Sequence, residues 1–159
     1  MTPALNYQLS TINYQLSTIN YQLSTINYQL STINYQLKKM PKGPLSQKSF
    51  AFALRIVKLG KYLRSKHKEY ILAKQVLRSG TAIGALVREA EHAQSRADFI
   101  SKLSIALKEA NETDYWLDLL HQSDYLSNES HASIHTDIQE LIRLLVSIIK
   151  SSKEANHAE

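Results

Sequence analysis

The stretch 95-SRADFISKLSIALKEANETDYWLDLL-120 has the most regular hydrophobic pattern in the chain. Its inward-facing candidates recur every three or four residues, at Phe99, Leu103, Ala106, Ala110, Thr113, Leu117 and Leu120. This spacing is typical of one face of an α-helix. Ser95 as N-cap and Asp98 at N3 form a capping box, and the acid also favours the positive end of the helix dipole. The stretch therefore predicts an amphipathic helix from Ser95 to about Ser123.

Three other segments show the same periodicity. The first should begin at an N-cap near Ser46 or Ser49 and end around 65–69, the second should run from Tyr70 to His92, and the last from Ser127 to about 154. In the first two we expect these residues to face inward: Ala53, Leu54, Ile56, Val57, Leu59, Leu63, Ile71, Leu72, Val76, Ile83 and Val87. Four such helices with short connections predict an all-α fold, an antiparallel up-down-up-down four-helix bundle.

Two features of this pattern need a packing explanation. Gly80 and Gly84 lie inside the second helix, where each costs about 1 kcal/mol relative to Ala. Their spacing of four puts them on one face, so we expect a neighbouring backbone to approach closely there. The run 141-LIRLLVSII-149 is more apolar than a single buried stripe requires, so part of the last helix is expected to face another subunit.

Four full copies of NYQLSTI occupy Asn6 to Ile33, and a partial copy follows at 34–37. Leu and Ile alternate at three- and four-residue spacing, which on a helix is a coiled-coil seam with Leu at a and Ile at d, a pairing that favours more than two strands. The Ser, Thr, Asn and Tyr content and the absence of charge argue against a stable helix, and a period-two alternation also suits a strand.

The identity of the copies points to tandem duplication of a 21-nucleotide unit, which preserves the reading frame. We interpret residues 1–39 as a dispensable leader, with Met40 as a candidate ancestral start and 40–48 as a linker before a helical domain at 49–154. An accessory oligomerisation seam and an essential element are the alternatives.

Charge is distributed unevenly along the chain. Residues 1–37 carry none, residues 38–78 hold twelve Lys/Arg and one acid for a net charge of +11, and residues 79–159 are net −6. The basic part is therefore expected to contact something anionic. The candidate nucleic-acid-binding residues lie on one arc of the first helix and one turn apart on the second: Lys48, Arg55, Lys58, Lys61, Arg64, Lys74 and Arg78. Tyr62 and Tyr70 stand among them and are candidates to stack on bases.

Composition and motifs exclude several other classes. The chain has no cysteine, which removes disulfides and thiolate sites and fits a reducing compartment. No run of eighteen apolar residues and no secretory signal pattern occurs, so we expect no membrane association. Phosphate-binding loops, nucleophile elbows and triad spacings are absent. No helix-turn-helix or zinc-finger spacing supports sequence-specific DNA recognition. We expect neither catalytic activity nor a cofactor.

Helical bundles often house metals between facing helices. The chain has one Asp118-x-x-His121 pair with Asp114 a turn earlier, and His131 and His135 stand four residues apart. The carboxylate and histidine sets of di-iron or zinc enzymes are incomplete. We interpret these residues as solvated polar faces at helix ends and expect no metal site.

Several stretches resemble a known family. They are 49-SFAFALRIVKLGKYL-63, 74-KQVLRSGTAIGALVREA-90, the stretch from 95 to 120, and 141-LIRLLVSIIKSSKE-154. Together they resemble the 23S ribosomal RNA intervening-sequence proteins, which are similar to the accessory variability determinant of diversity-generating retroelements. Arg78, Ser79, Ile83, Gly84 and Glu89 match the pattern of the second helix. Leu86 departs where relatives commonly have Asn, and Arg88 stands where an acid is common.

This resemblance implies a bacterial cytoplasmic protein, an antiparallel bundle, and assembly into a homopentameric barrel with a basic surface. For the retroelement relatives it implies binding of nucleic acid and of a reverse transcriptase, and it implies no catalytic residues. The repeat lies outside the resemblance.

Two functions follow as alternatives. The first is a non-catalytic, nucleic-acid-binding oligomer, with RNA favoured over DNA. The second is a structural or protein-interaction bundle, such as an adaptor for a reverse transcriptase, with the apolar last helix and the acidic third helix as docking surfaces. The alternative for the basic arc itself is a solvated face that only aids solubility.

Overall fold

The computed structural model describes the backbone of residues 3–39 and 43–154 and the side chains of 7–29 and 43–154. This part of the chain contains five helices and no strand, which confirms the all-α class. The helices are α1 (Pro3–Lys39), α2 (Pro44–Lys66), α3 (Ile71–Ala90), α4 (Arg96–Gln122) and α5 (Asn128–Glu154). The chain divides into two compact units, Met1–Met40 and Pro41–Glu159.

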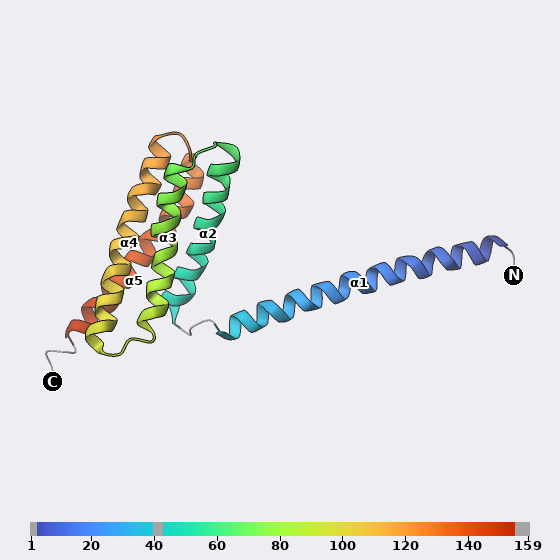
Figure 1. Cartoon of the computed structure of the whole chain (residues 1–159), viewed down its shortest axis with the longest axis horizontal. Helices are drawn as coiled ribbons and strands as arrows, with labels where there is room; N and C mark the ends of the chain where they lie inside the picture. The colour runs from blue at the N-terminus through green and yellow to red at the C-terminus, as the bar shows by residue number, and fades with distance from the viewer. Residues whose placement is uncertain (1–2, 40–42, 155–159) are drawn as a thin grey trace. The chain divides into compact units, whose positions relative to one another are not determined.

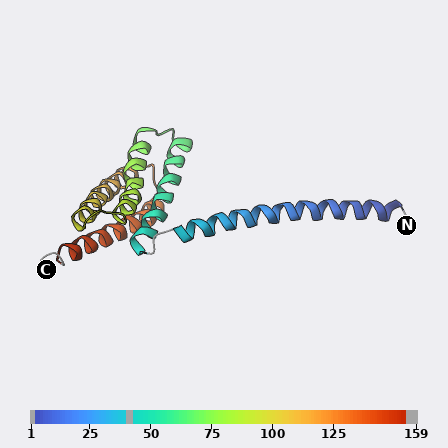
Figure 2. The same cartoon turned by 60° about the horizontal axis from the view of Figure 1, so that its bottom comes forward.

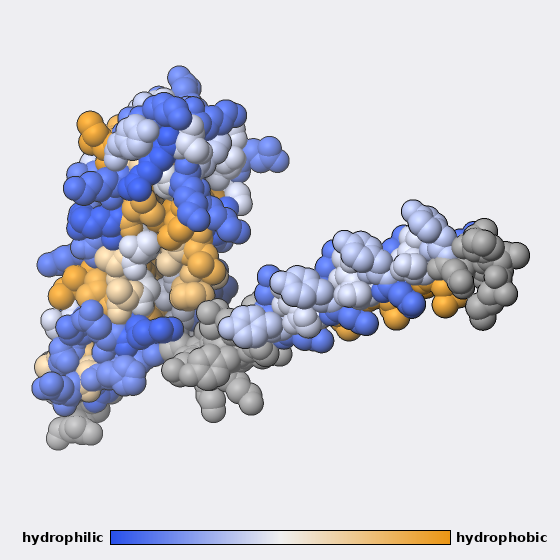
Figure 3. Space-filling model, turned by 45° about the vertical axis from the view of Figure 1, so that its right-hand side comes forward, coloured by the Kyte–Doolittle hydropathy of each residue, from blue (hydrophilic) through white to orange (hydrophobic). Residues whose placement is uncertain are grey.

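The repeat is helical, not extended, so the strand alternative is wrong. Each Thr hydroxyl at positions 11, 18 and 25 donates a hydrogen bond of 3.0 Å to the carbonyl of the Tyr four residues earlier. The Leu and Ile side chains between 9 and 26 form one stripe and are 50–58% exposed. Figure 3 shows this apolar stripe along the helix. The spacing of three and four therefore gives the seam geometry expected for a helical repeat.

The second unit consists of α2 to α5 around one apolar core. Each helix runs opposite to the one before it, and the views in Figures 1 and 2 agree on this order. α2 packs on α3, α3 on α4, α4 on α5, and α5 returns to α2, the neighbouring pair with the least mutual packing. The largest fully buried side chains include Phe52, Ile56, Ile83, Leu103 and Ile138. Every residue predicted inward in the 95–120 stretch is buried except Phe99, which is half-buried.

The helix ends confirm one predicted cap and correct another. Ser95 caps α4, where its hydroxyl accepts from Asp98 N at 3.1 Å, and the Asp98 carboxylate accepts from Gln94 N at 3.2 Å. α2, however, begins at Pro44 after the N-cap Gly43, and both Ser46 and Ser49 are buried inside it. Proline has no backbone N–H, and at the first helical position that N–H would have no partner within the helix. Proline is therefore favourable there. Residues 40–42 of the expected linker lie outside the described residues.

Close approach between α2 and α3 explains the glycines. A Cβ on Gly80 would lie 2.8 Å from Ile56 Cγ1, and a Cβ on Gly84 would lie 3.4 Å from the Ser49 carbonyl oxygen. The predicted close backbone contact is thus confirmed at Gly84, whereas at Gly80 a core side chain occupies the space.

Some residues predicted to be inward are exposed. Leu54 is 50% exposed, Val57 37% and Ile71 75%. The α2 core stripe runs instead through Phe52, Ile56, Leu59 and Leu63. On α5, the apolar run is mostly covered by its own unit, but Val146 remains 47% exposed. Apolar patches of this kind are visible on the surface of the second unit in Figure 3.

Candidate nucleic-acid interface

The seven predicted binding residues all lie on α2 and α3, but their charges are in different situations. Lys48, Arg55 and Arg78 form ion pairs with acids of this chain. Among the residues that the structure describes, the other four have no carboxylate within ion-pair distance, and all are exposed: Lys58, Lys61, Arg64 and Lys74. The predicted set therefore divides into three residues whose charge is paired within the chain and four whose charge is available to an external ligand.

Lys48 and Arg55 connect α2 to α5. Lys48 Nζ lies 2.9 Å from Glu140 Oε2. The Arg55 guanidinium pairs with Asp137 and also donates to Ser133, at 3.1 Å to its carbonyl oxygen and 2.9 Å to its hydroxyl. A guanidinium fixed by three acceptors on one helix has little capacity left for an external phosphate. These two side chains are thus better placed to join helices than to bind nucleic acid.

Arg78 connects α3 to α4 in the same way. Its guanidinium pairs with Glu112 and lies 3.6 Å from Glu109 Oε2. The Glu112 carboxylate also accepts from Trp116 Nε1 at 3.1 Å. The Trp116 hydrogen bond and then the Arg78 hydrogen bond lower the pKa of Glu112, while the Glu112 contact raises the pKa of Arg78. Both groups stay charged at neutral pH.

The remaining cations form what we call the basic cluster, at the carboxyl half of α2, the α2–α3 connection and the start of α3. Its members are Lys58, Lys61, Arg64, Lys66, Lys68 and Lys74. Lys66 and Lys68 were counted in the basic segment but were not predicted as contacts. Lys68 has a φ of 57° in the connection between the helices. The cluster carries six positive charges with one acid, Glu69, inside its range.

Aromatic side chains accompany the basic cluster, as predicted. Tyr62 is 39% exposed and Tyr70 59% exposed. Lys66 Nζ lies 5.7 Å from the centre of the Tyr62 ring. Exposed rings beside cations are the combination that single-stranded nucleic acids use for stacking and phosphate contact.

Acidic and histidine residues on α4 and α5 contact each other across the two helices, although Asp118 and His135 also stay partly exposed, at 48% and 37% of their side chains. His131 Nε2 lies 2.9 Å from Asp118 Oδ1, and His135 Nε2 lies 3.4 Å from Asp114 Oδ1. The His121 and His131 rings stack with centroids 4.4 Å apart. In the described part of the chain, no group of three or more such side chains is arranged to hold a metal ion. The sequence spacing of four brought the histidines onto one face, but their partners on α4 depend on helix packing.

Asp114 is the titratable group that this arrangement perturbs. Burial raises the pKa of its carboxyl, partly opposed by the nearby His135. Gln139 Nε2 donates to its other oxygen at 2.8 Å.

None of the described helices contains an apolar stretch that could span a lipid bilayer. The all-α fold and the exposed basic cluster together define the class: a small helical protein with a basic surface. The model of the family described as 23S rRNA-intervening sequence protein matches residues 44–147. The chain belongs to this family.

A solved structure supports the same assignment. The chain is similar to a protein of unknown function from the S23 ribosomal protein family of Bacteroides thetaiotaomicron VPI-5482, with 58% sequence identity and a TM-score of 0.66. The similarity covers 67% of this chain and 98% of the other. No curated protein matches the chain. The repeat helix α1 lies outside the residues that the family model matches.

Proposed function

We propose that this protein is a non-catalytic nucleic-acid-binding protein that acts as an oligomeric accessory factor, with RNA preferred to DNA. The observation that carries the proposal is the basic cluster, whose six cations are exposed and have no ion-pair partner among the described residues. The name of the family, which refers to a ribosomal RNA insertion, supports RNA as the partner.

The physical reason is counterion release. Each phosphate that a Lys or Arg neutralises releases condensed cations from the nucleic acid, so unpaired, exposed charges contribute most to affinity. Cations already paired within the chain would first have to give up their carboxylates. Lys58, Lys61, Arg64 and Lys74 of the predicted set therefore contribute more than Lys48, Arg55 and Arg78.

We further propose that the α2–α5 unit is an antiparallel up-down-up-down four-helix bundle that assembles into a homopentamer in the bacterial cytoplasm. The resemblance to the family supports both the assembly and the location. Exposed apolar side chains offer surfaces for such contacts: Phe50, Leu54 and Val57 on α2 and Val146 on α5. We also propose that it has no catalytic activity, because its sequence contains no motif that pairs a nucleophile with a general base.

The alternative function is a protein-interaction bundle, such as an adaptor for a reverse transcriptase, without direct contact to nucleic acid. A hollow near the end of α5 favours it, because Leu107, Val146 and Ile149 line it beside the charged side chains of Lys150, Lys153 and Glu154. Exposed apolar side chains bind proteins better than they bind phosphates. Pull-down from cells with and without nuclease separates the two functions, since only a protein partner survives nuclease.

The test of the proposed function is filter binding of RNA over a range of salt concentrations. Wild-type affinity should fall linearly with the logarithm of salt concentration. The variant Lys58→Glu, Lys61→Glu, Arg64→Glu should lose binding while keeping its helicity. A matched control, Arg96→Glu, Lys108→Glu, Arg143→Glu, makes the same change in net charge at exposed residues of α4 and α5. The control should bind much more tightly than the first variant. Equal loss in both would show that only net charge matters, and no salt dependence in the wild type would reject phosphate contact.

A further inference from the structure

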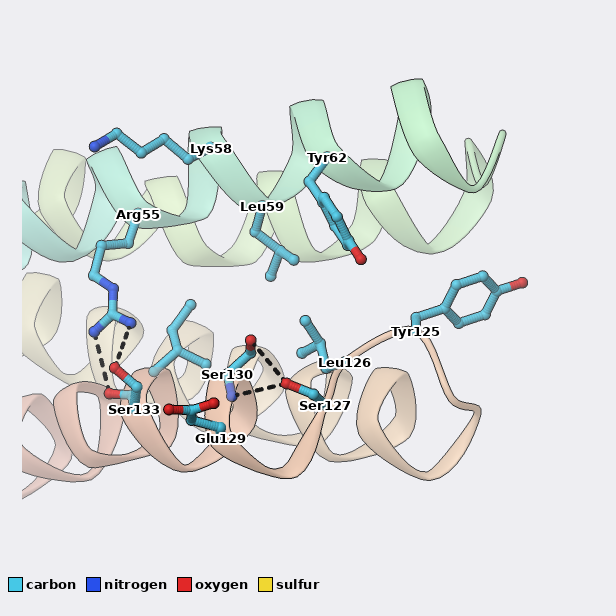
Figure 4. Close-up of a pocket in the computed structure, with 11 residues that line it drawn as sticks. Arg55, Lys58, Leu59, Tyr62, Tyr125, Leu126, Ser127, Glu129, Ser130 and Ser133 are labelled. Carbon is cyan, nitrogen blue, oxygen red and sulfur yellow. Dashed lines mark hydrogen bonds between the residues drawn. The ribbon is translucent and has the colours of Figure 1, made fainter.

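A groove opens on the surface where α2 faces the start of α5. Its volume is about 500 Å³, within the range of sites that hold small organic ligands. Its floor is apolar and buried, formed by Leu59, Leu126 and Ile134. Figure 4 shows α2 side chains on one side and those of the α4–α5 connection and α5 on the other. The groove lies between the least tightly packed pair of neighbouring helices in the unit.

Aromatic rings form one end of the groove. Tyr62 and Tyr125 both line it, and His67 lies edge-on to each, with ring centroids 5.1 Å and 5.4 Å away. The Tyr62 hydroxyl lies 3.1 Å from His67 Nε2, and the Tyr125 hydroxyl donates to Glu69 Oε2 at 3.3 Å. The hydroxyls are thus held by the protein. In the described residues neither tyrosine is stacked face to face on another ring. Lys66 Nζ lies over one face of Tyr62, so a flat group can lie against the other face of that ring and against Tyr125.

Charged and polar groups line the rest of the groove. Lys58 contributes a cation with no ion-pair partner among the described residues, whereas Arg55 is held by Asp137 and Ser133. The Ser127 and Ser130 hydroxyls are 3.0 Å apart, and the Glu129 carboxylate lies on the α5 side. A ligand that matches all of these is flat, carries hydrogen-bond donors and acceptors at its edge, and bears an anionic group at one end.

The geometry points to this groove as the site of one unpaired nucleotide of a single-stranded RNA. The base lies along Tyr62 and Tyr125 over the apolar floor, and its phosphate contacts Lys58 on the α2 side. Glu129 repels phosphate from the α5 side and accepts hydrogen bonds from base amino groups there, which sets the direction of the nucleotide. A base in a duplex is stacked on both faces and paired at its edge, so it cannot enter the groove. The inference rests on the proposed function and adds that the nucleic acid is single-stranded.

The test compares a 15-nucleotide single-stranded RNA with a duplex of the same sequence by fluorescence anisotropy of the full chain. The single strand should bind more tightly than the duplex. Tyr62→Leu and Tyr125→Leu should each weaken single-strand binding by about fivefold or more, the loss of one base–aromatic stack. Because no cation is removed, the salt slope should stay as in the wild type. Tyr115→Leu, at a tyrosine of α4 that is 58% exposed and lies outside the groove, should bind as the wild type does.

Competition provides a measurement that needs no variant. Cytidine monophosphate, whose base carries an amino group for Glu129, should displace the bound strand at concentrations where inorganic phosphate does not. Equal affinity for strand and duplex, equal effects of all three tyrosine variants, or equal competition by phosphate and nucleotide would overturn the groove proposal. In those cases the charge variants of the basic cluster still report on the proposed function. A wild-type protein that binds no RNA at low salt overturns the proposed function and this inference together.

Discussion

Arg55 of α2 and Asp137 of α5 form an ion pair although 82 positions separate them in the sequence. With Lys48 and Glu140 on the same two helices, this pair joins the least tightly packed neighbours of the unit. Two of the residues that looked most suited to phosphate therefore connect helices.

We predict that Arg55→Gln and Asp137→Asn each lower the free energy of unfolding by about 0.5–1 kcal/mol, the upper part of the range for partly exposed pairs. The double variant should lose little more than either single one, because the two changes remove the same contact. Urea unfolding of all four proteins measures this. RNA affinity should fall less in Arg55→Gln than in Lys58→Gln. An equal fall would place the Arg55 guanidinium on phosphate after all.

The two glycines of α3 are predicted to respond differently to alanine. Gly80→Ala pushes a methyl group into Ile56, 2.8 Å away, and should lower the free energy of unfolding by about 1–3 kcal/mol. Gly84→Ala meets the Ser49 carbonyl oxygen at 3.4 Å, an ordinary contact. There the helix propensity of Ala dominates, and stability should be unchanged or rise by up to about 1 kcal/mol. Thermal unfolding compares the variants, and equal effects would contradict the α2–α3 spacing.

The buried stripe of α4 gives a third prediction. Leu103 is 1% exposed, and Leu103→Asp puts an unpaired carboxylate into the core at a cost of several kcal/mol, comparable with the stability of a small domain. The variant should be unfolded or aggregated by circular dichroism and light scattering. Ile105→Asp is the matched control on the same helix, at a residue that is 40% exposed. It should stay folded. A folded Leu103→Asp protein with an unchanged melting temperature would contradict the helix phase.

Some of the features behind these tests could be predicted from the sequence, and others depend on how the helices pack. The periodicity of 95–120 and the cap at Ser95 are local, so helix type, phase and buried residues could be predicted there. The exposure of Leu54 and Val57 could not, because it depends on which side of α2 packs against α3 and α5 within the second unit, and these two side chains lie away from that packing. The helix start at Pro44 was missed because two serines further on were equally good cap residues.

The candidate site was predictable in outline only. The excess of Lys and Arg between 38 and 78 located the basic region, and the members from Lys48 to Arg78 do lie on α2, α3 and their connection. Which of them are neutralised depends on acids brought near by packing, such as Glu112 and Glu140, which lie 34 and 92 residues from their partners. The groove beside Tyr125 depends on the same long-range packing.

Asp114 predicts a pH dependence of stability. Burial raises the pKa of its carboxyl above the usual value near 4, so the folded state holds this proton more tightly than the unfolded state does. Its contribution to stability is therefore present below about pH 4 and is lost as the pH rises through the folded pKa. Asp114→Asn has no such proton. The free energy of unfolding of the variant minus that of the wild type, measured by urea unfolding, should be larger at pH 7 than at pH 4. A difference that is constant or decreases with pH would show that the His135 and Gln139 contacts outweigh burial.

The last prediction concerns the repeat. Removing residues 1–39 should leave the fold and the oligomeric state unchanged. In the described residues, the apolar core consists of residues from 45 to 149, all of which belong to the second unit. The family model begins at residue 44. Circular dichroism and multi-angle light scattering of the truncated and full chains make the comparison.

The exposed Leu and Ile stripe of α1 offers another way to form oligomers, so an unchanged oligomeric state after truncation has to be tested against it. A helical seam with Leu at a and Ile at d associates when other chains supply the same seam. Because every repeat is identical, a shift by seven residues gives an equivalent alignment, so seam-driven assembly would produce several sizes of particle instead of one. The full-length variant Leu16→Asn, Ile19→Asn breaks the stripe at two residues that are 57% and 56% exposed without shortening the chain. If the full chain forms one discrete oligomer, and the truncated and double variants form the same one, assembly resides in α2–α5. If truncation and the double variant both yield monomers, α1 is the oligomerising element and the interpretation as a dispensable leader is wrong.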